Sequence, residues 1–212
     1  MADYCICKKE KNQMSLVICP AYLPSIYYFY FLIKNDKITW YIHGDYQKQT
    51  FRNRTKIYSS NGLFKMYIPV VKAKNEKERK DLKTKICYEE NWQKQHWKTI
   101  ENSYSSSPYF EFYKYELIGF YKSKFEYLMD YNIKLIMTLL SILNIKLKTK
   151  SSKKILFQNE NEKKIISTKQ KKKIIFNKYT QVFSKKHGYL ENLSVIDLIF
   201  NLGPESIDFI NN

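Results

Sequence analysis

The sequence contains few glycines and few histidines, and this excludes several kinds of catalytic site. The five glycines, at positions 44, 62, 119, 188 and 203, are too dispersed for a GxGxxG or Walker A loop, which needs closely spaced glycines beside a phosphate. The three histidines form no HExxH motif, and no His, Asp or Glu cluster has metal-ligand spacing. A G-x-S-x-G turn is also absent. We therefore expect no Rossmann-type, P-loop or metal site, and the sequence indicates no particular cofactor.

The four cysteines, Cys5, Cys7, Cys19 and Cys87, form no CxxC pair and have no histidines at zinc-finger spacing. Reduced thiols are therefore expected. Cys19 and Cys87 lie in apolar, strand-like stretches, so we interpret them as core residues. A Cys/His nucleophile pair that meets only in the fold stays open as an alternative.

Long apolar runs are missing as well. The two longest, residues 26–33 and 136–143, are about eight residues each, whereas a bilayer-spanning helix needs roughly 18 to 20. The first residues contain lysines but no sustained apolar segment of a secretory signal. We therefore predict a soluble, cytoplasmic protein without a transmembrane segment.

The formal net charge of +17 normally indicates a polyanionic partner. Only three of the 37 basic residues are arginines, Arg52, Arg54 and Arg79, although arginine is the side chain that grips phosphate and guanine in bidentate fashion. The abundance of Lys, Asn, Ile, Tyr and Phe is that of a protein encoded by an A/T-rich genome. Nucleic acid is therefore not expected as the main partner.

Hydrophobic patterning predicts a single α/β domain over residues 1–212, with a mixed or partly parallel sheet flanked by helices. Its α/β core should span residues 16–145, followed by a loose lysine-rich excursion at 146–178 and a C-terminal helix region at 179–210 that packs back. Strands are expected at 14–19, 37–43 and 64–71, with a further short one at 85–88, and helices from Pro24 to about 34, at 92–104, over 125–143 and at 195–202.

The last of these helices carries clear end signals. Ser194 and Asp197 resemble a capping box, Leu193 and Leu198 can form a hydrophobic staple, and Gly203 followed by proline supplies the stop. We therefore assign structural roles to Asp197 and Gly203.

Two segments have the composition of a binding or catalytic site. Residues 45–54, in a polar connection that spans 44–62, combine Lys48, Arg52 and Arg54 with Gln47 and Asn53, which suits a phosphate, carboxylate or sugar ligand. The alternative is a solvated basic loop. Residues 92–97 place His96 one helical turn after Trp92, so His96 is either a general base or a packed helix histidine.

The same segments carry a family resemblance. Tyr22-Leu-Pro-Ser-Ile-Tyr-Tyr-Phe, Tyr46-Gln-Lys-Gln-Thr-Phe-Arg-Asn-Arg, Asn61-Gly, Ile68-Pro-Val, Asn91-Trp-Gln-Lys-Gln-His-Trp, Ser107-Pro-Tyr-Phe and Leu193-Ser-Val-Ile-Asp-Leu-Ile-Phe-Asn occur in the order seen in the WbqC-like family, in its Bacteroidetes-type form. The resemblance covers about residues 16–210. The chain departs from the family pattern at Gly44-Asp45, where Glu-His is usual, and over residues 161–169, where an Asp/Arg pair is expected.

The resemblance implies a role in surface-polysaccharide biosynthesis, by acyl or aminoacyl transfer to an amino sugar or related acceptor. It implies a small-molecule substrate such as a nucleotide-linked amino sugar, with His96 as the catalytic base. The substrate-binding residues that it implies are Tyr22, Pro24, Tyr28, Gln47, Lys48, Arg52, Asn53 and Arg54. Two alternatives stay open: a non-enzymatic ligand- or protein-binding module, and a polyanion or membrane-surface binder that acts through the lysine-rich tract.

Overall fold

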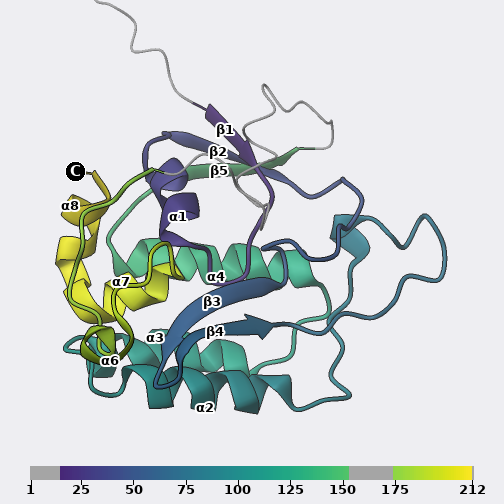
Figure 1. Ribbon diagram of the computed structural model, residues 1–212. Helices are drawn as coiled ribbons and strands as arrows, with labels where there is room; N and C mark the ends of the chain where they lie inside the picture. The colour runs from purple at the N-terminus through teal and green to yellow at the C-terminus, as the bar shows by residue number, and fades with distance from the viewer. Residues whose placement is uncertain (1–14, 153–173, 212) are drawn as a thin grey trace, which may run out of the picture.

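A computed structural model describes residues 15–152 and 174–211 and contains a three-stranded parallel sheet (Figure 1). The sheet order is β1 (Ser15–Ile18), β2 (Lys37–Tyr41) and β5 (Lys148–Ser152). Lys37 of the central strand pairs with Ser15 on one side and with Lys148 on the other. The predicted α/β class with a partly parallel sheet and flanking helices is therefore confirmed.

Helix α1 (Ile26–Ile33) connects β1 to β2 and is apolar along its whole length. It begins at Ser25, whose side-chain oxygen accepts a hydrogen bond from the Tyr28 backbone N–H at 3.2 Å. The sequence had suggested that Pro24 lies in the first turn of this helix. Pro24 instead precedes the cap residue, so that prediction was wrong. Phe29 and Leu32 are completely buried, because α1 lies between the sheet and the C-terminal helices.

A β-hairpin replaces the second half of the polar connection predicted at residues 44–62. Its strands are β3 (Arg54–Ser59) and β4 (Gly62–Tyr67), which pair antiparallel. The basic composition of β3 hid its alternation, in which Thr55 and Ile57 are buried. The strand predicted at 64–71 begins at Gly62 and ends at Tyr67, so that prediction was wrong about its bounds. Met66 and Ile68 are buried, whereas Phe64 is 44% exposed.

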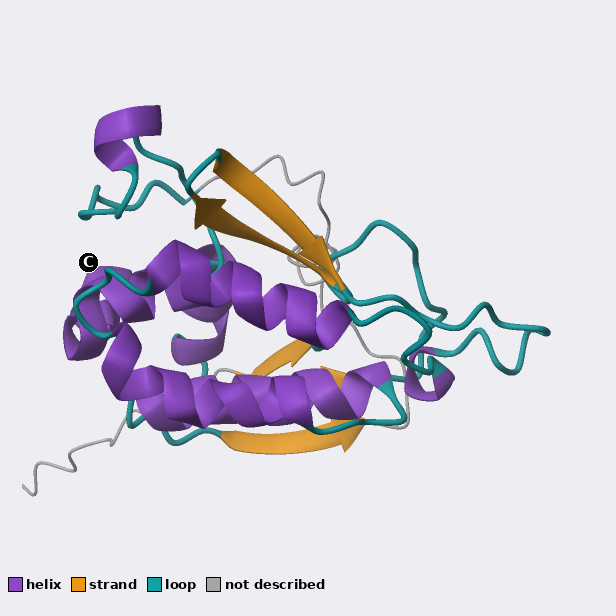
Figure 2. Cartoon of the chain, turned by 90° about the horizontal axis from the view of Figure 1, so that it is seen from below, coloured by secondary structure: helices purple, strands orange, loops and turns teal. Residues whose placement is uncertain are grey.

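Three helices form the middle of the molecule: α2 (Trp92–Tyr104), α3 (Phe110–Lys122) and α4 (Leu128–Ile142). Helix α3 packs between α2 and α4, and α4 crosses between the parallel sheet and the hairpin (Figure 1). Figure 2 shows the parallel sheet and the hairpin on opposite sides of the helices. Helix α3 was not predicted, because its sequence is aromatic and polar without a clear stripe. Among the described residues, no helix has the length and apolar character needed to cross a bilayer.

Other connecting segments also differ from the predictions. Residues 85–88 form only isolated bridges, Val70 with Ile86 and Lys85 with Tyr127, near the short turn η1 (Asp81–Lys83). The lysine-rich stretch was predicted to be loose, but residues 148–152 form β5. Backbone pairing with β2 requires no particular side chain, so the polar sequence did not reveal this strand. Residues 153–173 lie outside the described part of the chain.

The C-terminal region contains α6 (Ser184–His187), α7 (Val195–Leu202), η2 (Gly203–Glu205) and α8 (Ser206–Asn211). Helix α7 has the predicted bounds, and its stop residue Gly203 has φ +56°, with the Tyr109 ring too close for a Cβ atom. Ser194 is the N-cap, as predicted, and its side chain accepts a hydrogen bond from the Ile196 backbone N–H at 3.5 Å. The reciprocal half of the capping box is absent, because the Asp197 carboxylate accepts a hydrogen bond from the Tyr179 hydroxyl at 2.5 Å and the Ser194 N–H donates to the Lys56 carbonyl.

Candidate functional site

The hairpin carries a cationic hollow of about 530 Å³, a volume in the range of small-molecule sites. We call it the hairpin hollow. Its basic side chains are Arg54 and Lys56 of β3 and Lys65 of β4. Its other described lining residues, none of which is acidic, are Gln49, Phe51, Thr55, Met66 and Tyr67. Such a lining suits a small anion that carries an apolar or aromatic part.

The positive charges of the hairpin hollow lie close together because of strand register. Lys56 and Lys65 are direct cross-strand partners, and Arg54 is two residues before Lys56 on the same face of β3. Burial, and secondly the charge of Lys65, lower the pKa of Lys56. Among the described residues none of the three forms an ion pair. Two like charges directly opposite each other are unfavourable, so an anion bound between them would stabilise the hairpin.

His96 and Tyr22 form a buried pair behind the hairpin. The Tyr22 hydroxyl lies 2.9 Å from His96 Nδ1 and 3.1 Å from the Tyr121 hydroxyl. The rings of Tyr22 and His96 are stacked, and Trp92 contacts the His96 ring edge-on. The sequence prediction that Trp92 and His96 share a helix face is confirmed.

Burial decides the protonation state of His96. It lowers the pKa of His96 to about 4, and a hydrogen bond to the Tyr67 backbone opposes this shift only in part. His96 is therefore neutral at physiological pH, with Nδ1 accepting from the Tyr22 hydroxyl and the other nitrogen donating to the Tyr67 carbonyl. Tyr67 is also a lining residue of the hairpin hollow, so it is in contact with both His96 and that hollow.

Arg52 does not line the hairpin hollow. It is 3% exposed, and its Nε lies 2.8 Å from Asp81 Oδ1 in a buried ion pair. The Cys19 thiol donates to Asp81 Oδ2 at 3.8 Å, and burial raises its pKa. Cys19 is thus a core residue, as predicted, and Arg52 connects β1, the 45–54 segment and η1.

The other predicted site residues separate into two groups. Tyr28 and Asn53 are buried and bind backbone: the Tyr28 hydroxyl donates to the Cys19 carbonyl, and Asn53 Nδ2 donates to the Ile68 carbonyl. Gln47 and Lys48 are exposed on the loop that leads to Gln49. The structure therefore brings together Tyr22 and His96, places Arg54 in the hairpin hollow, and leaves Tyr28, Arg52 and Asn53 in structural contacts.

Sequence reasoning missed Lys56 and Lys65. A usable signal was present, since Arg54-x-Lys56 and Lys65-x-Tyr67 flank Ser60-Asn61-Gly62, a turn that predicts a hairpin. Asp81, the partner of Arg52, had no such signal, because the contact is made only in the fold. No group of three or more His, Cys, Asp or Glu side chains able to hold a metal ion occurs within residues 15–152 and 174–211.

A family model described as the WbqC-like protein family matches residues 19–175. The chain belongs to this family. The match includes the Tyr22–His96 pair and the hairpin hollow of this WbqC-like protein, and it ends before α6, so it is shorter than the stretch over which the sequence motifs were recognised. No curated protein and no solved structure matches the chain.

Proposed function

We propose that this WbqC-like protein is a cytoplasmic transferase that binds a small anionic substrate, such as a nucleotide-linked amino sugar, in the hairpin hollow. The transferred group would be an acyl or aminoacyl group. The observation that carries the proposal is the cross-strand pair Lys56–Lys65 with Arg54 beside it, in a hollow without a described acidic residue. A diphosphate would satisfy these cations with charge-assisted hydrogen bonds, and Phe51 and Tyr67 offer ring surfaces to the rest of the ligand.

In such a transfer, the amine of the acceptor attacks the acyl carbonyl, the new N–C bond forms, and the bond to the leaving group breaks. The amine proton has to reach a base and then the leaving group. His96 is neutral, as a base must be, and the Tyr22 hydroxyl on Nδ1 would pass the proton to it. Because Tyr22 is completely buried, this role requires the segment over Tyr22 to open during turnover.

The same burial favours a second candidate, a binding module without catalysis. Tyr22 and His96 then contribute only to the core, and the hairpin hollow alone carries the function. The two candidates differ in their response to His96→Gln, which should abolish transfer without weakening substrate binding in an enzyme. If the protein is a binding module, neither the unmodified protein nor His96→Gln forms a transfer product. Mass spectrometry of the acceptor measures this product.

Arg54→Ala and Lys65→Ala should each weaken the binding of a uridine diphosphate amino sugar by at least about tenfold, because a charge-assisted hydrogen bond contributes roughly 1.5–3 kcal/mol. Both residues are exposed, so the thermal midpoint of the free protein should stay nearly unchanged. Calorimetric titration measures the binding, and thermal unfolding measures the midpoint.

Lys98→Ala is the matched control, since Lys98 is exposed on α2 and is not among the residues that line the hairpin hollow. Equal weakening by Lys98→Ala would mean that the ligand responds to overall charge. Steep loss of affinity with salt would lead to the same conclusion and favour the polyanion alternative.

A further inference from the structure

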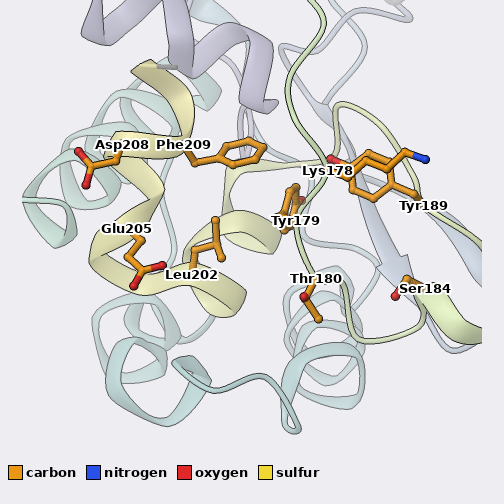
Figure 3. Close-up of a pocket in the computed structure, with 9 residues that line it drawn as sticks. All are labelled: Lys178, Tyr179, Thr180, Ser184, Tyr189, Leu202, Glu205, Asp208 and Phe209. Carbon is orange, nitrogen blue, oxygen red and sulfur yellow. The ribbon is translucent and has the colours of Figure 1, made fainter.

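A second hollow, of about 900 Å³, lies between residues 178–189 and the C-terminal helices. We call it the C-terminal hollow. It lies outside the residues that the family model matches. Figure 3 shows the nine residues that line it, with Tyr179, Leu202 and Phe209 between Glu205 on one side and Tyr189 on the other. The remaining lining residues are Lys178, Thr180, Ser184 and Asp208.

Aromatic rings form much of its wall. The Tyr179 ring meets Phe209 and Tyr189 edge-on, with centroid distances of 5.1 and 5.7 Å. Aromatic faces attract ammonium groups placed within about 6 Å of the ring centre. Lys178 Nζ already lies 5.9 Å from the centre of the Tyr189 ring. The wall therefore holds one ammonium group, supplied by the chain itself.

The charges around the C-terminal hollow are mostly negative. Glu205 and Asp208 line it, and neither forms an ion pair among the described residues. Leu202 is the last residue of α7, so the carbonyl end of that helix adds partial negative charge. Lys178 is the one basic residue of the lining.

A buried carboxylate lies directly behind this wall. Asp197 is 1% exposed, and its Oδ2 accepts hydrogen bonds from the Tyr179 hydroxyl at 2.5 Å and from Gln181 Nε2 at 3.5 Å. Burial is the main cause that raises the pKa of Tyr179 and of Tyr189, and the charge of Asp197 is the second cause for both. The negative field of Asp197 thus reaches two residues of the C-terminal hollow.

We propose that the C-terminal hollow binds a small ligand that carries two protonated amines. One ammonium group lies against the Tyr189 and Tyr179 rings, and the other is held by Glu205 and Asp208 on the opposite side of the hollow. The formal net charge of +17 repels cations from the molecule as a whole, so the attraction has to come from these local rings and carboxylates. The site is independent of the anion site in the hairpin hollow and does not depend on the proposed transferase activity.

The test is a titration of the full-length protein with 1,4-diaminobutane, followed by NMR at physiological ionic strength. 1,4-Butanediol is the uncharged control of similar shape. The diamine should shift the resonances of residues around the C-terminal hollow, and the diol should not. The double variant Glu205→Gln, Asp208→Asn should weaken diamine binding about tenfold or more. It removes two ion pairs with the ligand, and these also keep the other ammonium group in contact with the rings.

Three further variants separate the site from general charge effects. Lys178→Met should tighten diamine binding, because Lys178 competes for the Tyr189 ring. Tyr189→Leu should weaken binding, whereas Tyr189→Phe, which keeps the ring, should not. Glu89→Gln with Glu90→Gln removes the same charge from exposed positions outside the hollow and should leave the affinity unchanged.

The proposal is overturned if the diamine does not bind or if the diol binds equally well. It is also overturned if the Glu89 and Glu90 control weakens binding as much as the Glu205 and Asp208 variant, or if Lys178→Met weakens it. Circular dichroism of each variant establishes that the fold is intact before the affinities are compared.

Discussion

Replacing Arg52 by alanine should lower the free energy of unfolding by about 3–5 kcal/mol, the cost of leaving one member of a buried ion pair without its partner. Asp81 is completely buried and would keep its carboxylate in the core without the charge of Arg52, and the Cys19 thiol that donates to it is a weak donor. Urea denaturation followed by circular dichroism measures the loss. A protein of this size has little stability to spare, so Arg52→Ala should be partly unfolded at moderate temperature.

Arg54→Ala is the control for this prediction, because Arg54 lies two residues from Arg52 and is exposed. Its replacement should lower the free energy of unfolding by less than about 0.5 kcal/mol. The double variant Arg52→Met, Asp81→Leu should recover much of the stability lost in Arg52→Ala, since it removes both charges. If Arg52→Ala were as stable as the unmodified protein and had lost ligand binding, Arg52 would be a ligand residue and the ion pair would be incidental.

Acidification should act on this protein through His96 with a large effect. The pKa of His96 is lowered from its ordinary 6.5 to about 4 in the folded protein. Between these values the unfolded chain binds a proton that the folded chain does not, so stability falls as pH drops from about 6.5 to 4. At about 1.4 kcal/mol per pKa unit, the contribution of His96 to this loss is about 3 kcal/mol. The free energy of unfolding should therefore fall less between pH 7 and pH 4 in His96→Gln than in the unmodified protein, by about 3 kcal/mol.

Asp197 opposes this loss. Burial raises the pKa of Asp197 from 3.8 to about 6. Between these values the folded chain keeps a proton that the unfolded chain has released. Acidification over this interval therefore raises the free energy of unfolding by about 3 kcal/mol. The free energy of unfolding of Asp197→Asn should consequently fall more between pH 7 and pH 4 than that of the unmodified protein, by about 3 kcal/mol. Unfolding curves at both pH values measure the two differences, and a pH-independent difference in either variant would contradict the corresponding burial effect.

The elements predicted best are those whose signals are local. The bounds of α2 and α7 follow from helical periodicity and from end signals such as Gly203, and they agree with the structure. β3 and β5 were missed because their side chains are basic or polar, and they are strands by virtue of backbone pairing with β4 and β2. Non-local pairing is not visible in composition.

The site was predictable to a similar extent. The basic 45–54 segment includes Arg54, which the structure places in the lining of the hairpin hollow, and its role as a ligand residue stays a prediction. The same composition grouped Arg54 with Arg52 and Asn53, although these two are directed into the core. Which side of the chain an arginine faces depends on its partner, and Asp81 is distant in sequence. Lys56 and Lys65 became visible only through the register of the hairpin.

The pairing of β5 with β2 has a consequence for biosynthesis. On the ribosome, β1 and β2 emerge early, whereas the strand that completes their sheet emerges only after the three long helices have been translated. Until then one edge of β2 presents unpaired backbone groups, and such edges pair readily with other chains. We expect nascent chains that stall before Lys148 to recruit chaperones or aggregate, and chains that have released Ser152 to become protease-resistant.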